Sequence, residues 1–396
     1  MSRAPAPDGP AELHQEQHRR FRDPAQLAAQ WAGAGEADPR SFEHRARGPW
    51  WDILDELRIT LLVTREHEHL VLALRGGPAG SRVSYLSLPH PSGLAVDRDR
   101  RVVHVASTRN PNQVFDLMPV AGTLDRLDRP GPETSRELVP VRSRFYPGCL
   151  YIHDLALIGG ALHANAVGEN AVVRLLDDGR VERAWWPRCI EADGPPMFGR
   201  NHIQLNSIAA GADLDGSYFS ASSARMTGRR PGHLNYPVDG QGVIFSGATR
   251  EPMATGLTRP HSARLDRGTV WVDNSGYGQL GVALDGRFEP VASLPGWTRG
   301  LCILGDLAIV GTSRVIPRYR AYAPGLDVEA SHCGLHAVEL KTGAIRASLT
   351  WPFGNQIFAI DWLPSDVSGG FPWLASRPRP GRTGDLFYSF ETELDR

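Results

Sequence analysis

The segment LLVTREHEHLVLAL, residues 61–74, aligns without gaps on LHANAVGENAVVRL, residues 162–175. Each has a strand that ends near a small polar residue, a polar loop, and a following strand that ends in Leu. In the second copy these strands follow an inner strand that begins at Tyr151, whereas the first copy has no such strand before it. A candidate for the missing strand is QIFAIDWLP, from Gln356, after which no further strands of the unit follow. The two ends of the chain therefore predict one shared unit of sheet.

The same unit recurs along the chain, with further inner strands in PSGLAVD from Pro91, LNSIAAG from Leu205, RPHSARL from Arg259 and TRGLCILGD from Thr298. Repeats of one strand unit, with a last unit built from both termini, are typical of a β-propeller, which closes its ring and so removes exposed sheet edges. We predict an all-β fold, a six-bladed β-propeller closed by N- and C-terminal strands that share one blade. A β-sandwich of alternating strands is the alternative.

The composition changes at both ends of the repeats and predicts three parts. Residues 1–48 are expected to form a flexible or partly helical N-terminal arm, residues 49–363 the six-bladed propeller, and residues 364–396 a loosely ordered C-terminal tail. Short helices are expected in PAQLAAQW, residues 24–31, and in WWDILDEL, residues 50–57.

Charge and hydropathy exclude several classes of protein. Lys and Arg number 43 against 44 Asp and Glu, a net charge of −1, so the basic surface of a nucleic-acid binder is missing. No stretch approaches the ~18 consecutive apolar residues that predict a membrane span. The N-terminus has no apolar signal region, and the four Cys form no CxxC pattern. We expect a cytoplasmic protein whose partner is a small molecule or a peptide, with neither nucleic acid nor membrane involved.

In a propeller the innermost strand of each blade begins on the same face of the ring as the one where the second strand ends. Two rings of side chains should therefore converge at that end of the central channel. The first ring comprises Ser92, His153, Asn206, His261, Arg299 and Phe358; the second comprises Thr64, Ser107, Asn165, Ser222, Asn274 and Thr312. A channel needed only for packing would favour apolar residues there, because buried polar groups cost free energy unless they are partnered. These rings therefore indicate a functional site, unless their hydroxyl and amide groups only satisfy strand ends and channel water.

The first ring contains two histidines, and such a pair suits a metal. His153 and His261 would both point inward, and imidazoles favour Zn, Fe or Cu. A third ligand must come from His202, His163 or His90. Calcium is less favoured, because neither ring contains a carboxylate. A two-histidine catalytic pair without metal is the nearest alternative.

Arg299 and Tyr277 are the predicted catalytic residues. Arg299 would clamp a carboxylate or phosphate or stabilise an oxyanion, and Tyr277, in the loop NSGYG, could exchange a proton. Long insertions at 225–242 and 314–333 lie on the same face and should shape a rim, where binding residues are often found. The predicted substrate-binding residues are Ser92, Asn165, Asn206, Asn274, Arg314 and Tyr319.

Two further features are expected to be structural. Asp154 and Asp273 flank the ring positions and should face away from the channel, where they could support the neighbouring histidines. His67 and His69, in REHEH from Arg65, alternate on a hairpin and are typical of a solvated face. No nucleophile elbow, phosphate-binding loop or dinucleotide fingerprint is found.

A resemblance to an uncharacterised bacterial family of conserved hypothetical proteins rests on five phrases: PSGLAVD from Pro91, ASTRNPNQ from Ala106, GRNHIQLNS from Gly199, IFSGATREP from Ile244 and VDNSGYG from Val272. It covers residues 50–363 and implies no activity. At the level of fold the chain is similar to gluconolactonases, strictosidine-synthase-like proteins and peptidyl-hydroxyglycine lyases. The last group binds zinc through inward histidines and uses an Arg and a Tyr, which implies places for His153, His261, Arg299 and Tyr277. The resemblance also implies a third inward histidine, and this sequence has Phe358 at that position.

Three functions follow as hypotheses. The leading one is a metal-dependent enzyme, a lyase or hydrolase acting at the channel mouth on a small polar or peptide-like anionic substrate. The second is an oxygenase or other oxidoreductase with histidine-bound iron or copper. The third is a non-catalytic propeller that binds a peptide or glycan through its rim.

Overall fold

The computed structural model describes Ala34 and residues 37–78, 80–108, 112–120, 136–192, 194–199, 201–226 and 239–376, with no side chains for residues 317–319. The helix expected at 24–31 lies outside these residues. The one expected at 50–57 is confirmed as α3 (Trp50–Glu56). Ala34 is also helical, and short 3-10 helices lie at η1 (Pro39–Phe42), η2 (Val167–Glu169), η3 (Arg188–Glu191), η4 (Ser275–Tyr277) and η5 (Pro317–Tyr322). Within the described ranges, no helix has the length and hydropathy to cross a bilayer.

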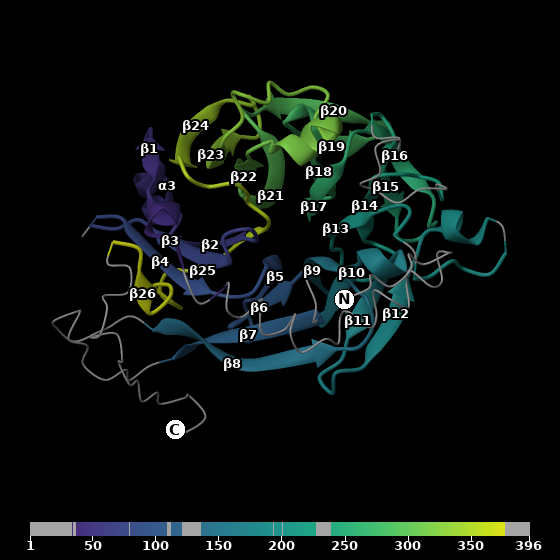
Figure 1. Ribbon diagram of the computed structural model, residues 1–396, viewed down its shortest axis with the longest axis horizontal. Helices are drawn as coiled ribbons and strands as arrows, with labels where there is room; N and C mark the ends of the chain where they lie inside the picture. Colours follow the sequence, from purple (N-terminus) through teal and green to yellow (C-terminus); the bar gives the residue numbers. More distant parts are fainter. Residues whose placement is uncertain are drawn as a thin grey trace, which may run out of the picture.

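Five sheets stand around a common axis (Figure 1). In order of pairing, the first contains β25 (Ile360–Pro364), β2 (Ile59–Arg65), β3 (Leu70–Arg75), β4 (Arg82–Ser87) and β26 (Trp373–Leu374). The second contains β5 (Pro91–Asp97), β6 (Val102–Ser107), β7 (Asn112–Val120) and β8 (Glu137–Tyr146). The third contains β9 (Ile152–Ile158), β10 (Ala161–Ala166), β11 (Ala171–Leu175) and β12 (Val181–Trp185).

The fourth sheet has eight strands: β13 (Leu205–Ala209), β14 (Tyr218–Ala221), β15 (Gly242–Ser246) and β16 (Pro252–Leu257), followed by β20 (Gly286–Ser293), β19 (Gln279–Leu284), β18 (Thr269–Asn274) and β17 (Pro260–Asp266). The fifth contains β1 (Arg45–Arg47), β24 (Ile345–Trp351), β23 (Cys333–Glu339), β22 (Leu307–Ser313) and β21 (Trp297–Leu304). The protein is therefore an all-β propeller, but its described sheets number five, not the six separate blades that the repeats predict.

The predicted pairing of the two chain ends is confirmed. β25, near the C-terminus, pairs antiparallel with β2, with Ile59 opposite Pro364 and Val63 opposite Ile360. The ladder continues through backbone bonds from Phe358 N to Thr64 O (2.9 Å) and from Thr64 N to Ala359 O (3.0 Å). Every residue of β2 is buried, which follows from its nearly continuous apolar sequence between two strands of the sheet.

The inner strands are irregular at their starts. β5, β9, β13, β17 and β21 each show a shift of register against the adjacent strand within their first few residues. Such bulges bend a strand and change the direction of a side chain. The first-ring residues lie at these shifts, so the bulges aim them differently from a regular strand.

Aromatic side chains pack between neighbouring sheets. The Trp185 ring of β12 lies 4.0 Å from the Phe219 ring of β14 in the next sheet, and Trp351 of β24 is completely buried. Both tryptophans therefore pack between neighbouring sheets.

Part of the predicted C-terminal tail packs on the propeller. Phe371 is fully buried in a cluster with residues of β3, β5 and β6, and β26 pairs with β4. The ordered structure thus continues beyond residue 363, although the three-part division of the chain itself stays a prediction. Residues 377–396 lie outside the described residues.

Candidate functional site

Four first-ring residues form what we call the axial cluster: His153, Asn206, His261 and Arg299. They come from β9, β13, β17 and β21, and none is more than 8% exposed. Their strands are nearest to the axis in Figure 1. The four consecutive inner strands therefore bring together two imidazoles, one amide and one guanidinium that lie up to 146 positions apart between His153 and Arg299 (299 − 153).

His153 is a neutral imidazole held mainly by aromatic contacts. Its ring lies 4.8 Å from the Tyr151 ring and 5.6 Å, edge-on, from the Phe358 ring. Burial, together with the positive charge of Arg299, holds its pKa well below the ordinary value. Its Nδ1 atom and Oδ1 of Asn206 are buried without a partner within hydrogen-bond geometry, and the Asn206 side chain acts to raise the pKa of His153. Buried polar atoms of this kind usually have a partner, and Asn206 is the neighbour that interacts with His153.

His261 is oriented by its Nδ1 atom. This atom lies 2.8 Å from the carbonyl oxygen of Arg259 and 2.9 Å from Oγ of Ser275. Because a carbonyl only accepts hydrogen bonds, we assign the proton of the neutral ring to Nδ1, which leaves Nε2 as an acceptor. Burial and the charges of Arg299 and Arg259 hold the pKa of His261 well below its ordinary value.

Two buried arginines supply positive charge to the site. The Arg299 guanidinium lies 3.3 Å from the centroid of the Phe358 ring. Arg259 lies 4.5 Å from the Tyr322 ring and donates from Nη1 to Oε1 of Gln204 at 2.5 Å. Stacking on aromatic faces stabilises a desolvated guanidinium. Phe358 occupies the position where the resemblance implies a third histidine. Its ring packs against both Arg299 and His153.

Polar side chains at the starts of inner strands and the ends of second strands form a circle of hydrogen bonds between neighbouring units of the ring. The bonds run from Thr64 Oγ1 to Ser92 O (2.7 Å), Ser92 Oγ to Ile152 O (3.0 Å), Asn165 Nδ2 to Leu205 O (2.9 Å), Asn206 Nδ2 to Pro260 O (3.0 Å), Ser275 Oγ to Thr298 O (2.6 Å) and Ser313 Oγ to Ile357 O (3.2 Å). Polar residues here therefore satisfy backbone groups, as the structural alternative in the sequence analysis supposes.

Three predicted substrate-binding residues are engaged in this way. Asn165 also accepts at Oδ1 from the backbone N–H groups of His153 and Asp154, at 3.2 and 2.5 Å. Asn274 accepts from the Thr258 N–H at 2.7 Å and donates to Oε1 of Gln279. Ser92 donates within the circle. Substrate binding by Ser92, Asn165 and Asn274 stays a prediction, while their observed contacts are structural.

The predicted metal ligands do not assemble. Nδ1 of His163 lies 2.9 Å from the carbonyl of its own neighbour Ala161, and burial lowers its pKa. His202 is half-buried, and its backbone N–H donates to Oδ1 of Asn170 at 3.4 Å. In the described part of the chain, no three His, Cys, Asp or Glu side chains are placed to hold a metal ion. The positive charges beside His153 and His261 also oppose a cation, so these residues do not fit the predicted metal.

The rim residues have separate positions. Tyr277 is 37% exposed, and its hydroxyl donates to Oδ1 of Asp239 at 3.0 Å, which raises its pKa. Gly325 packs on the Tyr277 ring so closely that a Cβ there would lie 2.0 Å from the ring. Arg314 is exposed and donates to the Pro352 carbonyl at 2.7 Å. The side chain of Tyr319 lies outside the described residues. Tyr277 thus joins the ends of the two rim insertions.

A carboxylate that the sequence analysis missed lies beside the cluster. Glu66 is 5% exposed, accepts from Oγ1 of Thr108 at 3.1 Å, and raises the pKa of His153. Its neighbour His69 is half-buried, and burial lowers the pKa of His69 to about 4. The prediction of a solvated face for REHEH is therefore wrong. The available signal was the position of Glu66, two residues after the second-ring residue Thr64.

The flanking aspartates serve the sheets. Asp154 accepts from Arg264 Nη1 at 2.9 Å and from the Ile208 N–H at 3.0 Å, which joins three inner strands. Asp273 is completely buried, and burial raises its pKa well above the ordinary value. Asp273 stands opposite His261 in the β17–β18 register, but the described residues show no side-chain hydrogen bond from either aspartate to a histidine ring, so the suggested role in supporting the histidines stays a prediction.

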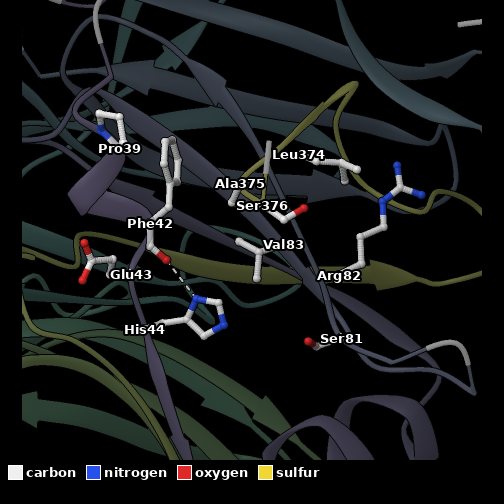
Figure 2. A pocket seen from close by; sticks show the side chains of 10 residues that line it. All are labelled: Pro39, Phe42, Glu43, His44, Ser81, Arg82, Val83, Leu374, Ala375 and Ser376. Carbon is white, nitrogen blue, oxygen red and sulfur yellow. Dashed lines mark hydrogen bonds between the residues drawn. The ribbon is translucent and has the colours of Figure 1, made fainter. Parts of the chain in front are cut away.

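A pocket of about 560 Å³ lies outside the ring, between η1, β4 and β26 (Figure 2). Its walls include Phe42, Val83 and Leu374, with Arg82 and His44 at its sides. Arg82 is paired with the fully buried Glu137 at 3.2 Å, and Nδ1 of His44 lies 2.9 Å from the Phe42 carbonyl. None of the predicted site residues lines this pocket.

Comparisons with known proteins agree with the fold. The chain is similar to a structure from a nidogen/laminin complex, at 11% identity and a TM-score of 0.50, over 78% of this chain and 99% of that one. It is also similar to a gluconolactonase from Xanthomonas campestris, at 12% identity and a TM-score of 0.44, over 75% and 86% of the chains. No curated protein matches the sequence.

The family comparison covers most of the chain. The model of a domain of unknown function, DUF4915, matches residues 48–369, which include every residue of the axial cluster and all the inner strands. This confirms the resemblance to an uncharacterised family. The chain belongs to the DUF4915 family.

Proposed function

We propose that the axial cluster binds a small anionic molecule and that the protein is an enzyme, a hydrolase or lyase, that acts on it. The observation that carries this proposal is the positive field at two buried, neutral imidazoles. Arg259 and Arg299 both lower the pKa of His153 and of His261. A positive field in a site that excludes water favours an anion, because interior charges are screened less than surface charges.

The cluster contains groups for proton transfer as well as binding. His153 is neutral, so its imidazole can accept a proton from water or from a carbon next to a carbonyl group. Arg299 would hold the anionic group or a developing oxyanion. An anion between the arginines and His153 would offset their repulsion of an imidazolium, and so raise the basicity of His153 when substrate is bound.

The metal of the leading sequence hypothesis is not part of this proposal. Its donors, His153, His261, His202 and His163, do not converge in the described residues, so no step is derived through a metal. No step is derived through iron or copper either, because the oxidoreductase hypothesis relies on the same histidines. A non-catalytic propeller that binds a ligand is kept as one outcome of the test.

We also infer that the ring has six blades. The eight-stranded sheet consists of two antiparallel units, β13–β16 and β17–β20, whose outer strands meet in a short parallel pairing of Ala254 and Thr255 with Gly286 and Arg287. Six inner strands contact one another in the circular order β25, β5, β9, β13, β17 and β21. Each of the six side-chain hydrogen bonds in the circle described above joins one unit of the ring to the next in this order. Counting the units in this way supports six blades.

The test compares the wild-type protein with Arg299→Gln, His153→Ala and the control His163→Ala, which removes a buried imidazole outside the cluster. Binding of inorganic phosphate and of malonate is measured by calorimetry. Turnover of anionic esters and lactones is followed by proton release, and elimination by the absorbance of a new conjugated double bond.

We expect Arg299→Gln to weaken anion binding at least about tenfold, the usual effect of a lost hydrogen bond to a charged group. His153→Ala should retain binding and lose turnover, and His163→Ala should retain both. Binding without turnover of any compound by the wild type would support the non-catalytic alternative. Equal anion affinity in the wild type and Arg299→Gln would overturn the proposal.

A further inference from the structure

Four residues share an unusual backbone conformation at equivalent positions of the ring. His90, Tyr151, Gln204 and Arg259 each immediately precede an inner strand, β5, β9, β13 and β17. Their φ angles are 44°, 53°, 47° and 54°, all in the left-handed region. Residues with a side chain are uncommon in this region, and glycine is the usual choice. Here the same position of four consecutive blades carries a long polar or aromatic side chain.

Left-handed residues also occur in the turns at the opposite ends of the inner strands. The β17–β18 turn has Arg267, with φ of 47°, beside Gly268, with φ of 79°; the β5–β6 turn has Arg101, with φ of 55°, and the β21–β22 turn has Gly305, with φ of 62°. A Cβ added at either glycine would meet no atom within 4 Å, so glycine serves the backbone conformation and not a lack of space. Side chains that persist in a disfavoured conformation often belong to functional sites.

Tyr151 contacts the axial cluster through its ring, Arg259 acts on it through its charge, and His90 and Gln204 contact charged neighbours of the cluster. Nδ1 of His90 lies 3.6 Å from Oε1 of Glu66. The Tyr151 ring lies 4.8 Å from that of His153, and Gln204 accepts from Arg259. The four groups differ chemically: an imidazole, a phenol, an amide and a guanidinium. A set that served only the fold would not need this variety.

We propose that His90, Tyr151, Gln204 and Arg259 form a specificity ring that selects the anionic molecule by its groups beyond the charged one. This inference rests on the proposed function, in which the axial cluster binds the anion. Arg259 would contact a second anionic group, while the amide of Gln204 and the phenol of Tyr151 would contact polar groups through hydrogen bonds. The molecule favoured by this ring is a small dianion or hydroxylated carboxylate.

The test uses the ratio of the dissociation constants for malonate and inorganic phosphate, measured by calorimetry on the full chain. The variants are Tyr151→Asn and Gln204→Asn, because asparagine adopts the left-handed region more readily than most residues and so preserves the backbone. The control is Asp285→Asn, at φ of 49° in the exposed turn between β19 and β20. Melting temperatures are measured for all variants.

We expect the ratio to change about tenfold or more in Tyr151→Asn or Gln204→Asn and to stay at the wild-type value in Asp285→Asn. Gln204→Asn should also melt at a lower temperature, because it removes the acceptor of the buried Arg259 guanidinium. If a variant does not fold, His90→Asn replaces it. An unchanged ratio in the folded ring variants, with binding still lost in Arg299→Gln, would overturn the specificity ring and leave the proposed function intact. Wild-type affinity in Arg299→Gln would instead contradict the proposed function.

Discussion

The buried ion pair near the shared sheet provides the sharpest test of how the ring is held closed. Arg65, at the end of β2, is completely buried, and its Nη2 atom lies 3.1 Å from Oε1 of Glu68. The guanidinium also donates to the Ser41 carbonyl at 2.6 Å and lies 5.2 Å from the Trp351 ring. Glu68 in turn accepts from the Asn355 N–H at 2.6 Å. The pair therefore joins the N-terminal segment to the strands on either side of the closure.

The perturbation is Glu68→Gln, which preserves shape and removes the negative charge. Loss of one partner of a buried pair costs about 3–5 kcal/mol, since it leaves the other charge uncompensated. The contact is not an aligned hydrogen bond, because Nη2 of Arg65 has no hydrogen-bond partner. The lower value, about 3 kcal/mol, therefore applies. At about 2 °C per kcal/mol for a domain of this size, the melting temperature should fall by about 6 °C.

The assay is urea unfolding followed by tryptophan fluorescence, together with thermal melting. The matched control is Glu329→Gln, whose partner Arg320 lies at a similar distance, 2.7 Å, but with both side chains exposed. Exposed pairs contribute little, so this control should melt within error of the wild type. Arg65→Met/Glu68→Gln should recover part of the loss, because no buried charge remains. A Glu68→Gln melting temperature equal to that of the wild type would refute the reasoning.

Three further predictions concern stability. Burial alone raises the pKa of the Asp116 carboxyl, but His104, Arg144 and Arg142 outweigh this effect and lower it from 3.8 to about 2. Folding stability from this group, about 2 kcal/mol, should be present above pH 3.8 and lost as the pH falls through about 2; denaturation midpoints measured across this range should lose that dependence in Asp116→Asn. Asn165→Ala should lower the unfolding free energy by about 2–3 kcal/mol, because it leaves buried N–H groups of His153 and Asp154 unpaired; hydrogen exchange at those two amides should accelerate, and unchanged exchange would contradict the role of the side chain. Phe371→Ala should cost about 3–5 kcal/mol in urea unfolding, as for a fully buried aromatic residue, whereas a change below about 1 kcal/mol would show that residues beyond 363 do not belong to the fold.

The architecture of the protein was predictable from its sequence to a large extent. The alignment of residues 61–74 on residues 162–175 indicated that second and third strands began the chain without an inner strand, and β25 supplies that strand from the other end. Such a pattern can be read directly, because strand periodicity, turn residues and strand order are local properties. The separation of the blades was not readable, since the contact between β16 and β20 depends on how far two outer strands extend.

The site was predictable only in part. His153, Asn206, His261 and Arg299 were identified by their equivalent positions in the repeats, and all four are buried at the starts of inner strands. The metal set stays a prediction: no three of its donor types come together in the described residues, and Nδ1 of His163 lies beside the Ala161 carbonyl, a local contact that a count of residues along a strand does not show. Glu66 was missed, because the alternation of polar residues in REHEH predicts an exposed hairpin, whereas neighbouring inner-strand ends cover this one.

The sequence by itself determined the propeller, the closure of its ring and the residue types that face its axis. Only the tertiary structure decided which polar groups are used up within the fold and which remain for chemistry. Hydrogen bonds between blades, the bulges that aim the inner side chains, and the left-handed residues before the strands all arise from contacts between segments far apart in the chain. Burial and the field of Arg259 and Arg299 then set the protonation of His153 and His261, and both depend on distances in space that no spacing along the sequence specifies.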